Sequence, residues 1–108
     1  MLARLELGFR QPALYFAITT STDQNSLEMM KVLVQFGANP KYKDQNDQTV
    51  FFYACRDGKL ACCKFLVEQG LDINEQDMYG QTPLFYAASE NRLNLLDLFE
   101  SRGKFGVM

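Results

Sequence analysis

The feature that most constrains the fold of this chain is an octapeptide that occurs twice. QTVFFYAC at residues 48–55 returns 33 residues later as QTPLFYAA at residues 81–88, with five of its eight positions identical. Self-similarity at a fixed interval of this kind is the signature of repeat architectures, in which each repeat is one supersecondary unit. The same interval aligns Leu27 with Leu60, and Leu60 with Leu93. We therefore predict a structural repeat rather than a doubled catalytic motif.

Three units can be traced along the chain. A weaker copy of the octapeptide, QPALYFAI, lies 37 residues before QTVFFYAC, so four extra residues (37 against 33) fall within TTSTDQNS at residues 19–26. This insertion either lengthens the loop between the two helices of unit one, where added residues cost little, or extends a contact surface. The predicted organisation is an N-terminal stub or cap at 1–10, a repeat domain at 11–103 with units at about 11–43, 44–76 and 77–103, and a tail at 104–108.

Each unit is predicted to contain two helices. Thr49 and Thr82 precede apolar stretches, where a threonine can cap a helix by accepting from its first free backbone N–H groups. Pro83 suits the first helical position, because its missing N–H has no partner there. The short first helix is expected to end near Gly58 in unit two and near Asn91 in unit three, since both residues tolerate a left-handed turn.

The second helix of unit two is predicted at residues 60–69, with Gly70 ending it. Its apolar face is formed by Leu60, Cys63, Phe65, Leu66 and Val67. The equivalent stripe of unit one is Leu27, Met30, Val32, Leu33 and Val34. That stripe could form a target groove or cofactor box, but its register with unit two favours core packing. One helix pair cannot bury its apolar face alone, so the units are expected to stack as a helical solenoid.

These residues resemble the ankyrin repeat family over about residues 11–103. The resemblance rests on Thr82-Pro83-Leu84, Ala87-Ala88, the segment GLDIN at residues 70–74 and the 33-residue period. It implies an all-α solenoid of helix-turn-helix units with short β-hairpin-like connecting loops, and a role in binding proteins.

The chain departs from the family pattern at three places. Phe52 and Phe85 stand where the family usually has histidine, so we expect ring packing instead of a histidine hydrogen bond. Asp47 occupies the hairpin position that Gly80 holds in the next unit, and aspartate tolerates positive φ at some cost. Unit one lacks the capping threonine, because Pro12 aligns with Thr82. At the C-terminal end, Glu100 stands where unit two has the apolar Val67, which predicts a polar cap. Phe105 and Val107 of the tail either dock on the last helix or begin a further unit.

Composition excludes several classes of function. Eleven basic and thirteen acidic residues give a net charge of −2 without a basic run, so no nucleic-acid partner is expected. No apolar run approaches the roughly 20 residues that span a bilayer, so no membrane insertion is expected. Cys55, Cys62 and Cys63 are an odd set with two adjacent members, which indicates reduced thiols and a cytoplasmic or nuclear protein. We further expect a monomer.

The sequence offers little for catalysis. There is no histidine, which excludes Ser-His and Cys-His pairs and histidine zinc sites. Cys55 and Cys63 are predicted to be buried, and Cys62 to be more exposed. The segment DQNDQT at residues 44–49 briefly resembles a calcium loop but lacks its glycine and its final glutamate. We predict no catalytic, cofactor-binding or metal site.

The resemblance implies binding on the concave face, where the hairpin tips meet the exposed ends of the first helices. The candidate partner-binding residues are Lys43, Gln45, Asn46, Gln48, Arg56, Asp57, Gln76, Met78, Tyr79, Gln81, Ser89 and Glu90, with Gln11, Thr19 and Thr20 in the weaker unit one. Met78 and Tyr79 are the most informative, because the core does not need them and tyrosine is enriched in binding hot spots. They either contact a partner or pack between hairpins.

The predicted function is a non-catalytic module that binds a protein or peptide. The alternative is a regulatory or substrate-recruiting domain of a larger enzyme or channel, which full-length transcript size would distinguish. The resemblance also suggests Asn74 as a candidate hydroxylation site, because Leu66, Asp72, Ile73 and Asn74 match the pattern of asparaginyl hydroxylase substrates. The alternative is that Asn74 hydrogen-bonds across its hairpin.

Overall fold

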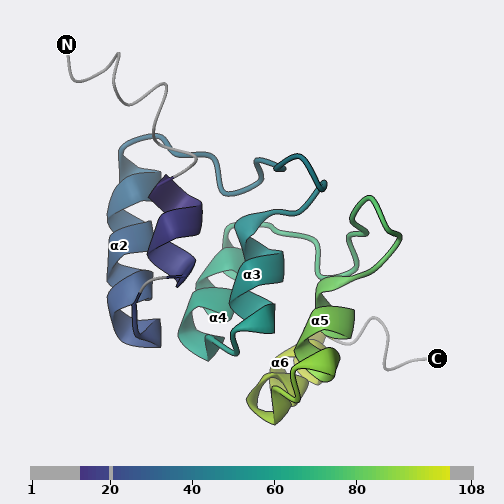
Figure 1. Ribbon diagram of the computed structural model, residues 1–108. Coiled ribbons are helices and arrows are strands. Elements are labelled where there is room, and N and C mark those ends of the chain that lie inside the picture. Colours follow the sequence, from purple (N-terminus) through teal and green to yellow (C-terminus); the bar gives the residue numbers. More distant parts are fainter. Residues whose placement is uncertain (1–12, 20, 103–108) are drawn as a thin grey trace.

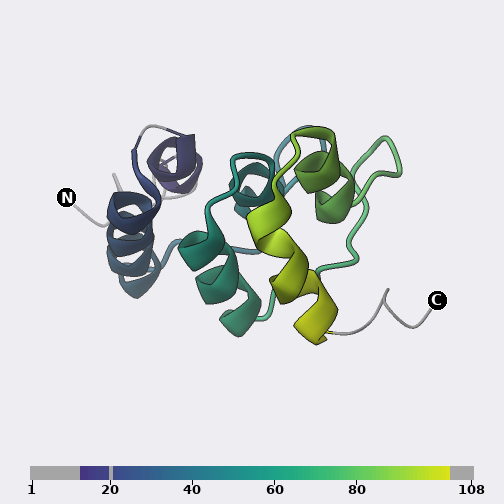
Figure 2. The same ribbon diagram turned by 90° about the horizontal axis from the view of Figure 1, so that it is seen from below.

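Three helix pairs stacked in chain order make up the fold. The computed structural model describes residues 13–19 and 21–102. The elements in chain order are a helix over residues 13–19, α2 (Asp23–Gln35), α3 (Val50–Arg56), α4 (Leu60–Glu68), α5 (Pro83–Ser89), the 3₁₀ turn η1 (Leu93–Leu95) and α6 (Leu96–Arg102). Figure 1 shows the pairs side by side, with the loops before α3 and α5 projecting to the same side, and Figure 2 shows the stack from below. The described ranges contain no β-strand, so the predicted all-α solenoid is confirmed.

The first helices of units two and three begin where the threonines predict. The Thr49 hydroxyl accepts from the Phe51 N–H at 3.3 Å, and the Thr82 hydroxyl accepts from the Phe85 N–H at 3.3 Å. Pro83 occupies the first turn of α5. Each hydroxyl thus satisfies one of the backbone donors that a helix start leaves free.

The predicted left-handed positions are also confirmed. Gly58 has φ 71° after α3 and Asn91 has φ 58° after α5. In the hairpins, Asp47 has φ 60° and Gly80 has φ 77°, so the aspartate adopts the conformation of the glycine it replaces. Asparagine and aspartate adopt this region at lower cost than most residues.

The core runs through all three units and is aromatic at its centre. Phe51, Phe52 and Phe99 are among its largest fully buried side chains. The Phe52 ring meets Tyr86 of the next unit at 6.1 Å between centroids in an edge-on arrangement, so ring packing replaces the family histidine as predicted. The equivalent Phe85 also contacts Tyr86, at 5.2 Å, but about half of it is exposed.

The prediction that the insertion lengthens the loop between the helices of unit one is wrong, because α2 begins at Asp23 and has 13 residues against 9 in α4. Polar groups from residues 19–26 instead join units one and two. Asp23 lies in the first turn of α2, and its carboxylate accepts from the backbone N–H groups of Ala61 and Cys62 at 2.9 and 3.1 Å. It therefore caps α4, where Lys59 at the N-cap position supplies no side-chain cap. The Ser26 hydroxyl, buried, donates to the Ala17 carbonyl at 2.6 Å.

Lys59 completes this junction. Its ammonium donates to the Ile18 carbonyl, to the Ser21 carbonyl at 2.6 Å and to the Ser26 hydroxyl at 3.1 Å. The carbonyl of Ile18 lies at the C-terminal end of the helix over residues 13–19, where a cation is favoured by the helix dipole. Residues 19–26 thus contain three residues that bond across the junction, namely Ser21, Asp23 and Ser26.

Units two and three are joined by ring contacts, by one repeated basic position and by further polar contacts. Arg92 lies 33 residues after Lys59, and its Nε donates to the Arg56 carbonyl at 2.8 Å. Asn94 adds a bond to the Gly58 carbonyl at 2.9 Å. The Phe51 ring meets the Phe99 ring at 6.3 Å between centroids. The same position of the repeat therefore carries a cationic tether at both junctions.

Two predictions about burial are wrong. Cys62 is fully buried, because it faces unit one, where its thiol donates to the Asp23 carbonyl at 3.5 Å. Val32 was expected in the core with its stripe, yet nearly half of it is exposed. Met30 of the same stripe is fully buried, and Leu27, Leu33 and Val34 pack against the core.

Candidate binding surface

Two aspartates 33 residues apart build the hairpins of the candidate surface. The Asp44 carboxylate accepts from the backbone N–H groups of Asn46 and Gln48 at 2.8 and 3.0 Å. The Asp77 carboxylate does the same for Tyr79 and Gln81, at 2.9 and 3.0 Å. A carboxylate that bonds the backbone two residues ahead mimics a turn and fixes the loop. Both hairpins therefore have one architecture, which the sequence analysis did not assign to these aspartates.

A tyrosine from each first helix completes the hairpin. The Tyr53 hydroxyl donates to Asp44, and the Tyr86 hydroxyl donates to Asp77. Burial, together with the neighbouring carboxylate, raises the pKa of each of these tyrosines to about 12. Both phenols therefore stay neutral donors at physiological pH.

The pKa of Asp77 shifts in the opposite direction to that of the tyrosines. Burial opposes its ionisation, but hydrogen bonds from the Tyr86 and Gln48 side chains and from the hairpin backbone outweigh it and lower its pKa below the usual value. The Gln48 side chain donates to Asp77 at 2.9 Å across the junction between units two and three. Gln48, predicted as a partner-binding residue, is thus half-buried and engaged between units.

The two hairpins are also tied to each other. The backbone N–H of Met78 donates to the Asn46 carbonyl at 3.0 Å, and Lys43 forms an ion pair with Glu75 at 2.6 Å. The hydrogen bond to Glu75 raises the pKa of Lys43. These links connect the tips of the two hairpins directly.

A pocket of about 510 Å³ opens beside the first hairpin, between units one and two. It is lined by Tyr15, Tyr42, Lys43, Asp44, Gln45, Asn46 and Tyr53. The Tyr15 ring meets Tyr53 at 5.2 Å and Tyr42 at 6.5 Å, both edge-on, and its hydroxyl donates to the Gln48 carbonyl at 2.6 Å. Three predicted residues, Lys43, Gln45 and Asn46, therefore share a pocket with tyrosines that the sequence analysis did not select.

Arg56 and Asp57 lie at the C-terminal end of α3. The Arg56 guanidinium stacks over the Tyr53 ring at 4.9 Å and pairs with Asp57 at 3.4 Å. Both side chains are half-buried, and the guanidinium lies over the Tyr53 ring, which itself lines the pocket.

The other predicted residues differ in accessibility. Met78 and Tyr79 are more than half exposed, which leaves their side chains accessible at the tip. Gln76, Ser89, Glu90 and Thr19 are exposed, whereas Gln81 is half-buried. Gln11 and Thr20 lie outside the described residues. Asn74 is exposed, and its backbone N–H donates to Asp72 at 2.9 Å; its hydroxylation stays a prediction.

The thiols form a buried set. The Cys55 and Cys63 sulfurs lie 3.7 Å apart, and all three cysteines are free and buried. Burial raises the pKa of the Cys62 thiol, which disfavours the nucleophilic thiolate. Among the residues that the structure describes, no three histidine, cysteine, aspartate or glutamate side chains are grouped to hold a metal ion. Over the same ranges, none of the helices combines the length and the apolar character that crossing a membrane requires.

Stacked helix pairs with projecting, mutually bonded hairpins define a class of protein, the helical repeat solenoid. A family model described as ankyrin repeats (3 copies) matches residues 11–105. The chain belongs to the ankyrin repeat family, whose members are generally protein–protein interaction modules. A search of curated proteins found no match.

Proposed function

We propose that this chain is a non-catalytic module that binds a protein or an extended peptide on its concave face. The observation that carries the proposal is that the residues shared by the two hairpins shape the loops, whereas the residues that differ lie at the tips. Their shared residues, Asp44 with Asp77 and Tyr53 with Tyr86, are engaged in bonds that shape the loops. The residues that differ, Met78 and Tyr79 against Gln45 and Asn46, are the ones whose side chains the tips present.

The chemistry of the tips supports a protein partner. Exposed tyrosine and methionine side chains provide apolar contact area, and both residue types are enriched at protein interfaces. Tyrosine has few rotatable bonds, so it loses little conformational entropy when it binds. The pocket between units one and two adds a recess in which tyrosine rings and polar side chains are mixed. Because the hairpins are bonded to each other, their loops lose little conformational entropy on binding.

The surface charge supports mixed polar contacts rather than recognition by one sign of charge. Lys43 is paired with Glu75, and Arg56 is paired with Asp57. Pairs of this kind at the rim of an interface contribute more to orientation and association rate than to affinity. The main contribution to affinity is therefore assigned to Met78, Tyr79 and the tyrosine pocket.

Affinity capture from the source cell tests the proposal. The wild-type chain is compared with the double variant Met78→Ala/Tyr79→Ala and with the control Lys64→Ala/Glu68→Ala, which also removes two exposed side chains, leaves the net charge unchanged and lies on α4, off the hairpins. We expect the tip variant to bind its partner at least tenfold more weakly, about 1.4 kcal/mol, and the control to bind like wild type. Unchanged capture by the tip variant together with loss in the control would place binding elsewhere.

The alternative, a recruiting domain of a larger enzyme or channel, uses the same face. The size of the full-length transcript distinguishes the two, because a recruiting domain would be encoded within a longer transcript than a free-standing module. The hydroxylation proposed at Asn74 is tested separately by mass spectrometry of the protein purified from its source, where a 16-Da addition on the peptide carrying Asn74 is the expected result, 16 Da being about the mass of one added oxygen atom. An unmodified peptide would contradict it.

A further inference from the structure

Residues 33 positions apart allow the two stacking faces of each unit to be compared. We call the side turned toward the preceding unit the N-side face and the side turned toward the following unit the C-side face. Cys62 lies on the N-side face of unit two, because its N–H and thiol bond to Asp23 of unit one. Phe52 lies on the C-side face of unit two, because its ring meets Tyr86 of unit three. The equivalent residues mark the same faces on units one and three.

On the C-side face of unit three, side chains are exposed whose counterparts in unit two are buried. In unit two, Phe52 is 2% exposed and Cys63 is 0% exposed. Their counterparts in unit three, Phe85 and Leu96, are 47% and 49% exposed. A pocket of about 140 Å³ at this end is lined in part by Leu84, Ala88, Leu93 and Leu96. The polar cap expected from Glu100 therefore does not extend to this face, although Glu100 itself is exposed.

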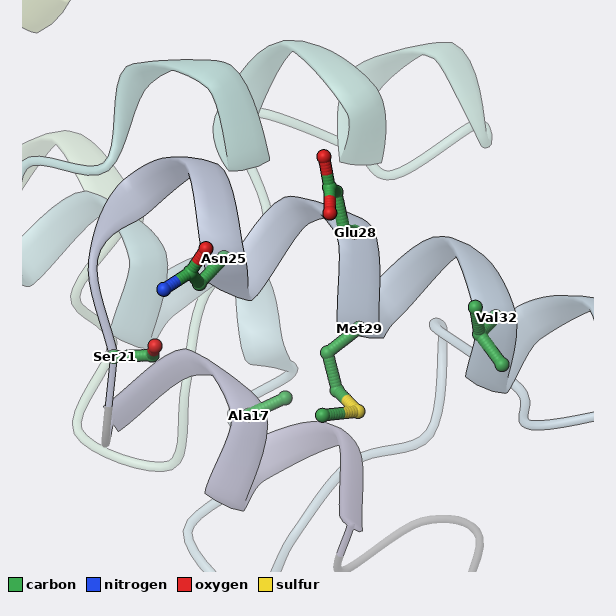
Figure 3. Close-up of a pocket in the computed structure, with 6 residues that line it drawn as sticks. All are labelled: Ala17, Ser21, Asn25, Glu28, Met29 and Val32. Atoms are coloured by element: carbon green, nitrogen blue, oxygen red, sulfur yellow. The ribbon is translucent and has the colours of Figure 1, made fainter.

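The N-side face of unit one shows the same difference. Cys62 of unit two is 0% exposed, whereas its counterpart Met29 is 54% exposed. Leu98 of unit three is 4% exposed, whereas its counterpart Val32 is 45% exposed. These two residues of α2 line a pocket of about 480 Å³, in which Met29 lies over Ala17 (Figure 3). The exposure of Val32, unexpected from the sequence, follows from its position on this face.

Each junction inside the molecule joins a C-side face to an N-side face, so the two ends of the stack are the two halves of an interface that the chain already forms twice. We propose that the chain self-associates head to tail, with unit three of one copy stacked on unit one of the next. The occupant of each end is a second copy of this chain, in continuity with the internal stacking. Such a contact is heterologous, so it adds further copies rather than closing at two.

This inference does not depend on the proposed function, because the end faces and the hairpin tips share no residues. It departs from the monomer expected from the sequence. Stacked copies would continue one concave surface, and a partner with repeated epitopes would then bind with higher avidity than one copy allows. A single-epitope partner would bind each copy independently.

Sedimentation equilibrium of the full chain, from micromolar to millimolar concentration, tests the proposal. We expect the wild-type weight-average mass to rise with concentration above the 12.4 kDa of one chain. Met29→Glu on the N-side end and Leu96→Glu on the C-side end each place a charge in the proposed contact, and each variant alone is expected to remain near 12.4 kDa. Lys64→Gln changes the net charge by the same amount at an exposed site on α4 and is expected to behave like wild type.

Mixing the two variants tests whether the C-side end of one copy binds the N-side end of another. The Met29→Glu copy keeps its C-side end and the Leu96→Glu copy keeps its N-side end, so an equimolar mixture should form dimers of twice 12.4 kDa and no larger species. Thermal unfolding by circular dichroism checks that both variants fold, since each substitution is at a half-exposed position. A wild-type chain that stays monomeric throughout, or a mixture that remains monomeric while wild type associates, would overturn the proposal.

Discussion

The junction between units one and two and the junction between units two and three occupy the same place in the repeat but are stabilised by different groups. The first is held by Lys59 and Asp23, whose side chains bond to the backbone of the neighbouring unit, and by one ring pair, Tyr15 against Tyr53. The second has two ring pairs, Phe51 with Phe99 and Phe52 with Tyr86, with Arg92 as its tether. The difference shows that an insertion can change how a repeat junction is held without changing the order of stacking.

The physical origin of the difference lies in residues 19–26. The insertion brings Asp23 into the first turn of α2 and close to the start of α4, whose own N-cap residue supplies no side-chain bond. Directed hydrogen bonds to helix ends then supply part of the stabilisation that rings supply at the second junction. The two junctions should therefore respond differently to substitution, solvent and pH.

Removing a ring from the second junction should have the largest effect. Phe51→Ala empties a fully buried site against Phe99, and we expect a loss of about 3–5 kcal/mol in the free energy of unfolding, measured by urea denaturation. Phe85→Ala is the matched control, because it removes an identical side chain from a half-exposed position. It should lower the free energy of unfolding by under about 1 kcal/mol. Equal losses from the two substitutions would contradict the assignment of Phe51 to the core of the junction.

Removing the ammonium from the first junction should have a smaller effect. Lys59→Met keeps most of the aliphatic chain but leaves the carbonyls of Ile18 and Ser21 without this donor, so we expect a loss of about 2 kcal/mol in urea denaturation. Lys64→Met, at an exposed position of the same helix, should change stability by less than about 0.5 kcal/mol. If both variants unfold at the same urea concentration, Lys59 does not tether the units.

The cap that Asp23 provides should be worth less again. Asp23→Ala removes the acceptor for two N–H groups of α4, for which we expect a loss of about 1 kcal/mol. Asp23→Asn keeps an acceptor oxygen and should restore part of the loss. Hydrogen exchange at the Ala61 and Cys62 amides provides a local measurement, and exchange unchanged by Asp23→Ala would contradict the capping role.

The pH dependence of the second junction should be the smallest effect. Hydrogen bonds to Asp77 lower its pKa in the folded state, so its stabilising contribution is present above the unfolded value of about 3.9 and is lost as the pH falls through the lower folded value. The stability difference between wild type and Asp77→Asn should be under about 1 kcal/mol near neutral pH and should shrink below about pH 4. A difference that grows on acidification has the wrong sign for this account.

The parts of the fold that could be predicted from the sequence are those set by nearby residues. The threonine caps, Pro83 and the left-handed Gly58 and Asn91 depend on local backbone chemistry, which a repeated motif displays twice. The hairpin aspartates could also have been found, because Asp44 and Tyr53 recur as Asp77 and Tyr86 at the same separation. That pairing of an aspartate with a tyrosine nine residues later is visible in both units.

The remaining features depend on contacts between units that no local pattern shows. Asp23 meets residues 38 and 39 positions away, and Lys59 reaches Ile18 at a separation of 41, through an insertion that shifts the repeat register. The burial of Cys62 and the exposure of Val32 likewise depend on which face of a unit is covered. For the binding surface, the sequence selected Met78 and Tyr79 but missed Tyr15, Tyr42 and Tyr53, since their shared pocket forms only on stacking.

Exchanging the hairpin tips tests the central claim most directly, namely that shared residues build the scaffold and differing tips bind the partner. Met78→Gln/Tyr79→Asn/Gly80→Asp writes the first tip onto the second hairpin, and Asp47 shows that aspartate tolerates the final position. We predict a melting temperature within about 4 °C of wild type, the shift expected for under 1 kcal/mol in a domain of this size, together with loss of partner capture. Full partner capture by the folded exchange variant would contradict the claim.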